Sequence, residues 1–390
     1  MRTRTRTSSR GFSLIEMLIA LSTGLIVLMG AAGIYSNSVA ASWSVTQRAQ
    51  MQQDGRAAYN LLTQDISLAG AGLPFGGVAL ASGAKIPKIG CDVTTTLCHL
   101  GASNSASLGY PPENGSPSIN QLYGVIPGCK QGPTVNASTG ATDVITVAYS
   151  DNVLLMPNYV VQFNDTNGNS VTFTNPNPAS NQALNNAAVG LNKGDLILFA
   201  YGSSYAVADV TSPPGTGSGP QYSVSFANAD LLQFNQNAAT SNNLTALIKS
   251  CNSTGTADNT KAICPIGTAP LAKNAGLVTA TRIYVVTYYV DTTLGEPRLM
   301  RQVNALAPVP VADNVTNLQF TYNAYDSNGN LVQNASCDAG GAANASLIRD
   351  INVNMSLRSQ KKGVTGYQGF AMQGSVSARN LSFNERYGSN

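Results

Sequence analysis

Residue types that carry catalysis or bind metals are scarce in this sequence. His99 is the only histidine among 390 residues, and it stands beside Cys98. No Cys-x-x-Cys pair, H-E-x-x-H run, G-x-S-x-G turn or Walker-type phosphate loop occurs. The missing ligand spacing argues against zinc, and the missing motifs argue against the common hydrolases and nucleotide-binding enzymes. We therefore expect no enzyme, no cofactor and no metal.

Charge is also sparse, and the basic excess is local. Charged residues make up 11% of the chain, and four of its 22 basic residues lie in the first ten positions, namely Arg2, Arg4, Arg6 and Arg10. Without them, 18 basic residues face 19 acidic ones, so a general nucleic-acid surface is disfavoured. A small cluster, Arg358, Lys361 and Lys362, allows a phosphate or DNA contact, but a solvated strand end is favoured over it.

Six cysteines are an even count, which in an exported chain predicts disulfides. The sequence-local pairs Cys91–Cys98 and Cys251–Cys264 are preferred among the 15 complete pairings. Cys129 and Cys337 then pair with each other or stay free.

Two acidic stretches are weighed as calcium loops. Residues 165–169 and 326–330 resemble the opening of such a loop, but each lacks the downstream glutamate. Asn-Gly between apolar runs is an ordinary hairpin turn, and this interpretation is preferred.

Proline is absent before Pro74, which permits one very long N-terminal helix. Residues 12–35 are almost wholly apolar, and 24 residues suffice to cross a bilayer core of about 30 Å. Residues 36–72 turn amphipathic, with an apolar stripe at three- and four-residue steps formed by Ala58, Leu61, Leu62, Ile66 and Ala69. Gly70, Gly72 and Pro74 supply the stop signal. Trp43, the only tryptophan, suits an interfacial anchor or packing against neighbouring helices.

One carboxylate, Glu16, interrupts the apolar run. An unpaired carboxylate in lipid costs at least a few kcal/mol, so a function is the first hypothesis and a snorkelling side chain the alternative. The stretch "GFSLIEMLIAL" resembles the class III signal of type IV pilins and type II secretion pseudopilins. That resemblance implies that a prepilin peptidase cuts after Gly11 and methylates Phe12. It also implies that Glu16 promotes assembly by meeting the N-terminal amine of the neighbouring subunit.

The remaining sequence predicts a β-rich head over residues 73–390. Runs such as "RIYVVTYYV" and "INVNMSL" are rich in β-branched and aromatic residues, and the second alternates cleanly. A second β-rich lobe is expected around residues 140–230, and a partly helical excursion within 228–276. The blocks "NKGDLILFAYGSSYAVADVTS", "TATRIYVVTYYVDTTLGEPRLMRQVN", "VADNVTNLQFTYNAYDSNGN", "LIRDINVNMSLRSQKK" and "FAMQGSVSARN" are similar to PilW-like minor pilins in order and pattern. Residues 76–140 depart from that pattern and are expected to be an exposed, variable insertion.

These observations predict an α+β protein: a leader (1–11), a transmembrane half-helix (12–35) and an amphipathic half-helix (36–72) packed on an antiparallel head (73–390). The resemblance implies a PilW-like minor pilin at the fibre tip, acting in assembly or initiation of a type IV pilus. Its implied partners are other minor pilins, the major pilin, the prepilin peptidase and the inner-membrane assembly platform. The arginines before the helix predict a cytoplasmic N-terminus and a periplasmic head, which later reaches the cell surface in the pilus. A J-like type II secretion pseudopilin and a pilus-borne adhesin or DNA receptor remain the alternatives.

Overall fold

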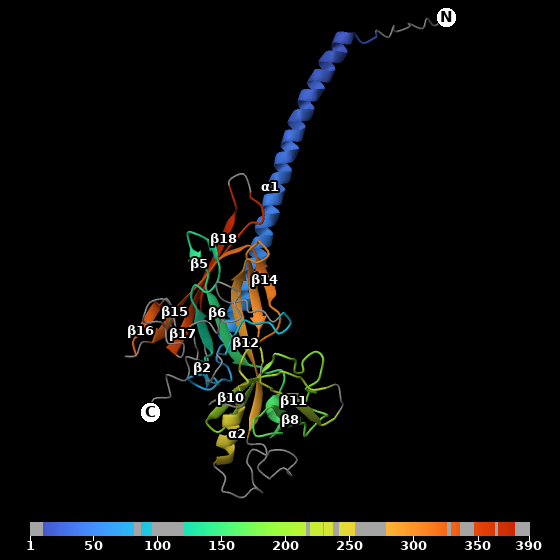
Figure 1. Cartoon of the computed structure of the whole chain (residues 1–390). Coiled ribbons are helices and arrows are strands. Elements are labelled where there is room, and N and C mark those ends of the chain that lie inside the picture. Colours follow the sequence, from blue (N-terminus) through green and yellow to red (C-terminus); the bar gives the residue numbers. More distant parts are fainter. Residues whose placement is uncertain are drawn as a thin grey trace, which may run out of the picture. The chain divides into compact units, whose positions relative to one another are not determined.

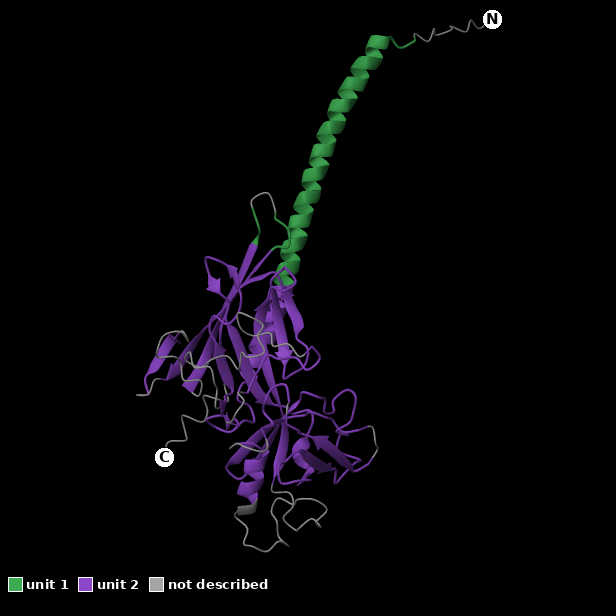
Figure 2. Ribbon diagram, in the orientation of Figure 1, with its two compact units in different colours: residues 1–53, 359–368 green, residues 54–358, 369–390 purple. Residues whose placement is uncertain are grey.

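The computed structural model describes residues 11–81, 87–95, 121–215, 219–228, 230–236, 242–253, 278–325, 329–335, 347–362 and 366–378. The chain separates into two compact units, which Figure 2 colours. The first unit comprises residues 1–53 and 359–368, and the second comprises residues 54–358 and 369–390. The boundary falls inside the first helix, so this helix contributes to both units.

The N-terminal helix α1 (Leu14–Leu68) is continuous over 55 residues (Figure 1). This confirms the predicted long helix. Gly30 and Gly33 lie inside it without ending it. The helix ends at Leu68, just before the predicted stop signal, where Gly70 and Gly72 adopt φ angles of 78° and 71°. This left-handed region favours glycine and is typical just past a helix end.

Within the second unit, the amphipathic part of α1 buries the predicted stripe. Ala58, Leu62, Ile66 and Ala69 are fully buried, and Leu61 is half-buried. The helix also approaches a sheet closely at Gly55. A Cβ built on Gly55 would lie 3.1 Å from Met372 Cε and 3.2 Å from Leu357 Cδ1. The absence of a side chain there lets the helix pack tightly against these two strand residues.

The largest sheet has seven strands and the order β10-β9-β12-β13-β14, with β6 pairing both β12 and β3. Its long central strand pairs with β9 through its first residues, with β6 through its middle and with β13 through its last residues. All these pairings are antiparallel, as the sequence predicts. The strands are β3 (Val125–Gly128), β6 (Val144–Ser150), β9 (Leu196–Tyr201), β10 (Ser204–Asp209), β12 (Thr279–Asp291), β13 (Arg298–Val303) and β14 (Val309–Asp313).

A four-stranded antiparallel sheet contains the C-terminal predicted strands in the order β16-β15-β17-β18. The alternation expected for residues 351–357 is confirmed, because the four apolar positions are buried and the polar positions between them are half-exposed. The strands are β15 (Val315–Tyr325), β16 (Leu331–Ala335), β17 (Ile348–Arg358) and β18 (Gly369–Ser377).

The expected second β-rich lobe takes the form of a three-stranded sheet, β11-β8-β7, whose core it shares with residues of β9 and β10. Four phenylalanines fill this core, with adjacent ring centroids 5.4–6.3 Å apart: Phe163, Phe173, Phe199 and Phe226. The helix α2 (Leu244–Ser253) confirms the partly helical excursion expected within residues 228–276. A 3-10 turn, η1 (Met156–Asn158), precedes the first strand of the lobe. The three strands are β7 (Val160–Phe163), β8 (Ser170–Thr174) and β11 (Gln221–Ser225).

The hairpin turn between β7 and β8 occupies one of the two stretches weighed as calcium loops. Asp165 Oδ1 accepts the backbone N–H groups of Asn167 at 2.8 Å and Asn169 at 3.2 Å, and Gly168 has a φ of 73°. These contacts are those of an Asx turn. The second stretch, 326–330, lies partly outside the described residues.

The described parts of residues 76–140 correct one expectation. β1 (Val78–Ala79) pairs with β2 (Gln121–Leu122), β3 joins the seven-stranded sheet, and β4 (Thr134–Asn136) forms a hairpin with β5 (Gly140–Ala141). Val78, Leu122 and Ile126 are buried in one core cluster with residues of β12. The prediction of an exposed insertion is therefore wrong for these residues. Strands of two to four residues are too short to show a period of two in the sequence.

Candidate processing and assembly site

Ser13 and Glu16 form a capping box at the N-terminus of α1. The Glu16 carboxylate accepts the backbone N–H of Ser13 at 3.0 Å, and the Ser13 hydroxyl accepts the backbone N–H of Ile15 at 3.4 Å. A carboxylate in the first turn is also favoured by the positive end of the helix dipole. Glu16 therefore has a local role in starting the helix, which the sequence analysis did not anticipate although the S-x-x-E spacing was visible.

The predicted cleavage position lies immediately before this cap. Gly11 is exposed, a Cβ built on it would meet no atom within 4 Å, and the Phe12 side chain is 89% exposed. The structure thus leaves the Gly11–Phe12 peptide bond open to a processing enzyme. It also brings Gly11, Phe12 and Glu16 together at one end of one helix.

The first half of α1 exposes its apolar side chains all round. Every large apolar side chain between residues 12 and 35 is half exposed or more. Among the described residues, α1 is the one helix long and apolar enough to cross a membrane. A helix that is apolar on every face is stable in lipid or among other helices and unstable in water. This N-terminal helix fits a membrane-anchored chain.

A buried carboxylate, Asp65, ties the second half of α1 to the seven-stranded sheet. Its Oδ1 accepts the hydroxyl of Tyr149 on β6 at 2.8 Å, and its Oδ2 accepts the hydroxyl of Tyr288 on β12 at 2.6 Å. Arg301 on β13 donates its Nε–H to Oδ2 at 2.8 Å and pairs with the charge. Burial and the negative charge of Asp65 raise the pKa of both tyrosines, which keeps them protonated as donors.

Sequence reasoning did not single out Asp65, although a signal was present. Asp65 stands next to Ile66 of the apolar stripe, so it is a lone acid at a position that the helix must bury. Its partners lie 84, 223 and 236 residues away, and no spacing rule identifies them.

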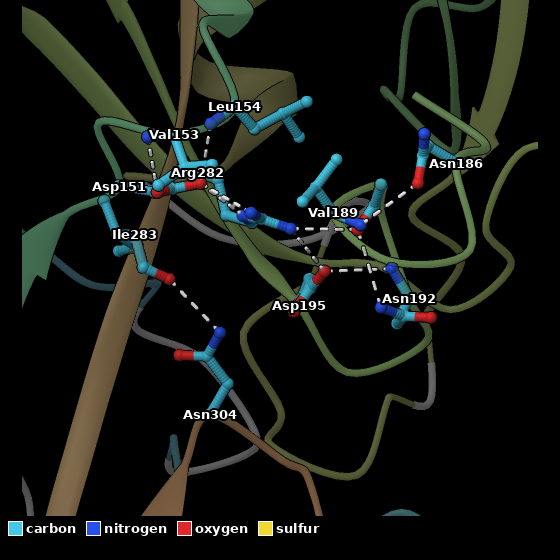
Figure 3. A network of polar contacts seen from close by, with 11 residues as sticks. Asp151, Val153, Leu154, Asn186, Val189, Asn192, Asp195, Arg282, Ile283 and Asn304 are labelled. Atoms are coloured by element: carbon cyan, nitrogen blue, oxygen red, sulfur yellow. Dashed lines mark hydrogen bonds and ion pairs between the residues drawn. The ribbon is translucent and has the colours of Figure 1, made fainter. Parts of the chain in front are cut away.

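A second buried network centres on Arg282 of β12. Figure 3 shows its guanidinium between the carboxylates of Asp151 and Asp195. It donates to Asp151 Oδ2 at 2.9 Å and 2.5 Å, lies 3.6 Å from Asp195 Oδ2, and donates to the carbonyl of Gly190 at 2.9 Å. Asp151 also accepts the backbone N–H groups of residues 153 and 154. The network holds the loops after β6 and before β9 against the central strand.

In this region, burial disfavours the charged forms of Asp195 and of a further acid, Asp209. Burial raises the pKa of Asp195, although the Asn192 N–H and Arg282 oppose that shift. Burial, with repulsion from Asp230 and Asp195, raises the pKa of Asp209 well above its usual range, against the opposing effect of Lys193. Among the described residues, no group of three or more His, Cys, Asp or Glu side chains is placed to hold a metal ion.

Three of the predicted disulfide cysteines lie within the described residues. Cys91, Cys129 and Cys251 are each disulfide-bonded. Cys98, Cys264 and Cys337 lie outside the described residues, so the predicted pairs remain predictions.

The comparisons with known proteins bear on the N-terminus alone. A family model described as the prokaryotic N-terminal methylation motif matches residues 6–32, which include Gly11, Phe12 and Glu16. No curated protein matches the chain, and no solved structure matches it. The match includes the stretch GFSLIEMLIAL, which resembles the signal of prepilins. Proteins with this motif are typically structural subunits. It supports a role like that of a type IV pilin or a pseudopilin.

Proposed function

We propose that this chain is a minor pilin resembling PilW that acts in assembly or initiation of a type IV pilus. The observation that carries the proposal is the N-terminal arrangement. An accessible Gly11–Phe12 bond directly precedes a capped helix whose first half is almost wholly apolar and has one carboxylate in its first turn.

The proposed mechanism is structural. A prepilin peptidase cuts after Gly11 and methylates the new amine of Phe12, while the four leader arginines keep that end cytoplasmic. The helix stays in the inner membrane with a periplasmic head until assembly. It then leaves lipid for a bundle formed with other minor pilins and the major pilin, and the Glu16 charge pairs with the N-terminal amine of a neighbour.

The size of the head favours a low copy number. Removing 11 leader residues from 390 leaves 379, most of them in the β-rich part. A subunit this bulky is difficult to repeat along a thin fibre, which favours the tip.

A non-enzymatic role agrees with how the described polar clusters are used. Asp65 and Arg282 are satisfied by groups of the chain itself, and their contacts hold elements together.

The nearest rival is a J-like minor pseudopilin of a type II secretion system, which would have the same N-terminal chemistry in a different machine. The PilW-like order of the C-terminal strand blocks favours the pilus. A tip adhesin or DNA receptor would add a ligand to the same architecture.

A deletion strain complemented with Glu16 variants tests the proposal. Fibres are sheared and counted by electron microscopy, secreted enzymes are assayed in parallel, and mass spectrometry of the purified chain reports cleavage and methylation. Glu16→Gln preserves the capping box, since glutamine also accepts the Ser13 N–H, but it removes the charge. Glu16→Ala removes both.

We expect fibres to fall sharply on deletion while secretion persists, and the mature chain to begin at a methylated Phe12. Neither Glu16 variant should restore fibres if the charge drives docking. Rescue by Glu16→Gln alone would reduce Glu16 to a helix cap. Normal fibres with failed secretion would assign the chain to the secretion pseudopilus.

A further inference from the structure

The described parts of the loop 359–368, residues 359–362 and 366–368, belong to the first unit together with the first part of α1, and the contacting residues Gln368 and Ser44 are 324 positions apart in the sequence. The base of the loop is closed by Ser359, which donates its backbone N–H to the Gln368 carbonyl at 2.7 Å and accepts the Gln368 N–H on its hydroxyl at 3.0 Å. Gln368 then donates its side-chain amide to the Ser44 hydroxyl at 2.9 Å. The Lys361 ammonium lies over the Trp43 ring, 5.5 Å from its centroid.

These contacts place Lys361 over Trp43 and Gln368 beside Ser44. Lys362 and Tyr367 belong to the same loop, and Arg48 follows Ser44 by four residues, about one turn of α1. We call Trp43, Arg48, Lys361, Lys362 and Tyr367 the basic and aromatic patch. Trp43 is 60% exposed and Tyr367 is 49% exposed, and the three cations are exposed as well. Residues 17–53 and 359–368 contain no aspartate or glutamate. Three positive charges therefore stand on the first unit with no acid to balance them between Glu16 and Asp54.

The patch lies next to the apolar run along the same helix. Trp43 follows Tyr35, the last residue of that run, by eight residues, which is about 12 Å along a helix axis. The polar layer on each side of a bilayer core is about 5–8 Å thick, and long lysine stems carry their charge several ångströms from the backbone. Tryptophan, tyrosine and lysine are the residue types that anchor a helix at this level.

We propose that this patch binds anionic phospholipid headgroups on the side of the membrane at which the apolar run ends. The inference rests on the proposed insertion of residues 12–35 into a bilayer. The loop supplies two cations to a stretch of helix, residues 17–53, that otherwise carries one, Arg48, and Trp43 supplies the aromatic ring for the interface. A lipid contact of this kind holds the subunit in the membrane, and assembly into a fibre must break it.

Tryptophan fluorescence can measure this contact without a label, because Trp43 is the only tryptophan of the chain. The full-length protein is reconstituted into nanodiscs in which a small fraction of the lipid is brominated close to the glycerol. The brominated lipid is phosphatidylglycerol in one series and phosphatidylcholine in the other. The ratio of Trp43 quenching in the two series measures the preference for the anionic headgroup.

The test variant is Lys361→Gln/Lys362→Gln, and its matched control is Lys193→Gln/Lys249→Gln, which removes the same charge from exposed positions in the second unit. We expect wild type and control to prefer phosphatidylglycerol. The test variant should lose up to roughly 5-fold of that preference per lysine, which corresponds to about 1 kcal/mol each. The preference should also fall as salt is raised.

Equal quenching by the two lipids in the wild type overturns the proposal, and so does equal behaviour of test variant and control. A change in Trp43 emission on adding duplex DNA, without a lipid preference, would make the patch a nucleic-acid surface instead. A second reporter, Ile26→Trp in a Trp43→Phe background, monitors the apolar run in nanodiscs whose lipid is brominated along the acyl chains. Quenching of this reporter without quenching of Trp43 leaves membrane insertion standing and refutes the headgroup contact alone.

Discussion

Replacing Asp65 by asparagine should destabilise the second unit by about 3 kcal/mol. The substitution keeps the shape of the side chain but removes the charge that pairs with Arg301 and serves two tyrosine hydroxyls. Breaking a buried pair by removing one partner costs about 3–5 kcal/mol. The Arg301 side chain is 25% exposed, so water relieves part of its lost pairing and the lower end of that range applies.

Urea unfolding of the full-length chain in detergent, followed by near-ultraviolet circular dichroism of the tyrosines, measures this loss. With a slope of about 3 kcal/mol per molar urea, the midpoint should fall by about 1 M. Asp54→Asn is the matched control, since Asp54 is exposed on the same helix and its replacement should cost less than about 0.5 kcal/mol. Equal midpoints for the two variants would refute the assignment of Asp65 as the residue that fastens the helix to the sheet.

Three further predictions use the same unfolding assay. Arg282→Met should cost about 3–5 kcal/mol, since two buried carboxylates lose their cation, and a midpoint near that of the wild type would contradict this. Asp209 binds its proton more tightly in the folded state, so its contribution is complete below about pH 4 and is lost as pH rises through its raised pKa. Asp209→Asn, which resembles the protonated form, should therefore lose less stability than the wild type as the pH rises above about 4, and parallel pH profiles would argue against this. Gly374→Ala should cost about 1–2 kcal/mol, because the new Cβ overlaps the Tyr59 hydroxyl, and Tyr59→Phe in the same chain should recover part of that loss.

The sequence predicted best the features that depend on residues close together in the chain. The apolar stripe from Ala58 to Ala69 follows the helical period, and the buried positions of β17 follow the period of two. Gly11, Phe12 and Glu16 belong to one short motif, which the family model for residues 6–32 matches, while their roles in cleavage, methylation and assembly stay predictions.

The features that escaped prediction depend on contacts between distant segments. Asp65 looks like an ordinary helix acid until Tyr288 and Arg301 are known to face it. Trp43 and Lys361 were recognised separately, but nothing in either stretch indicates that they meet. The core role of Val78 and Leu122 was hidden because their strands have two residues each.

The fastening of α1 through Asp65 has a consequence for the order of folding. The helix is made first, but Tyr288 and Arg301 leave the ribosome 223 and 236 residues later. At roughly 5–20 residues per second, the stripe of α1 waits for tens of seconds without its partners. Contacts so distant in sequence also slow the search for the native topology. A nascent chain of this protein therefore exposes an aggregation-prone helix face during most of its synthesis, and a chaperone that covers this face should raise its yield.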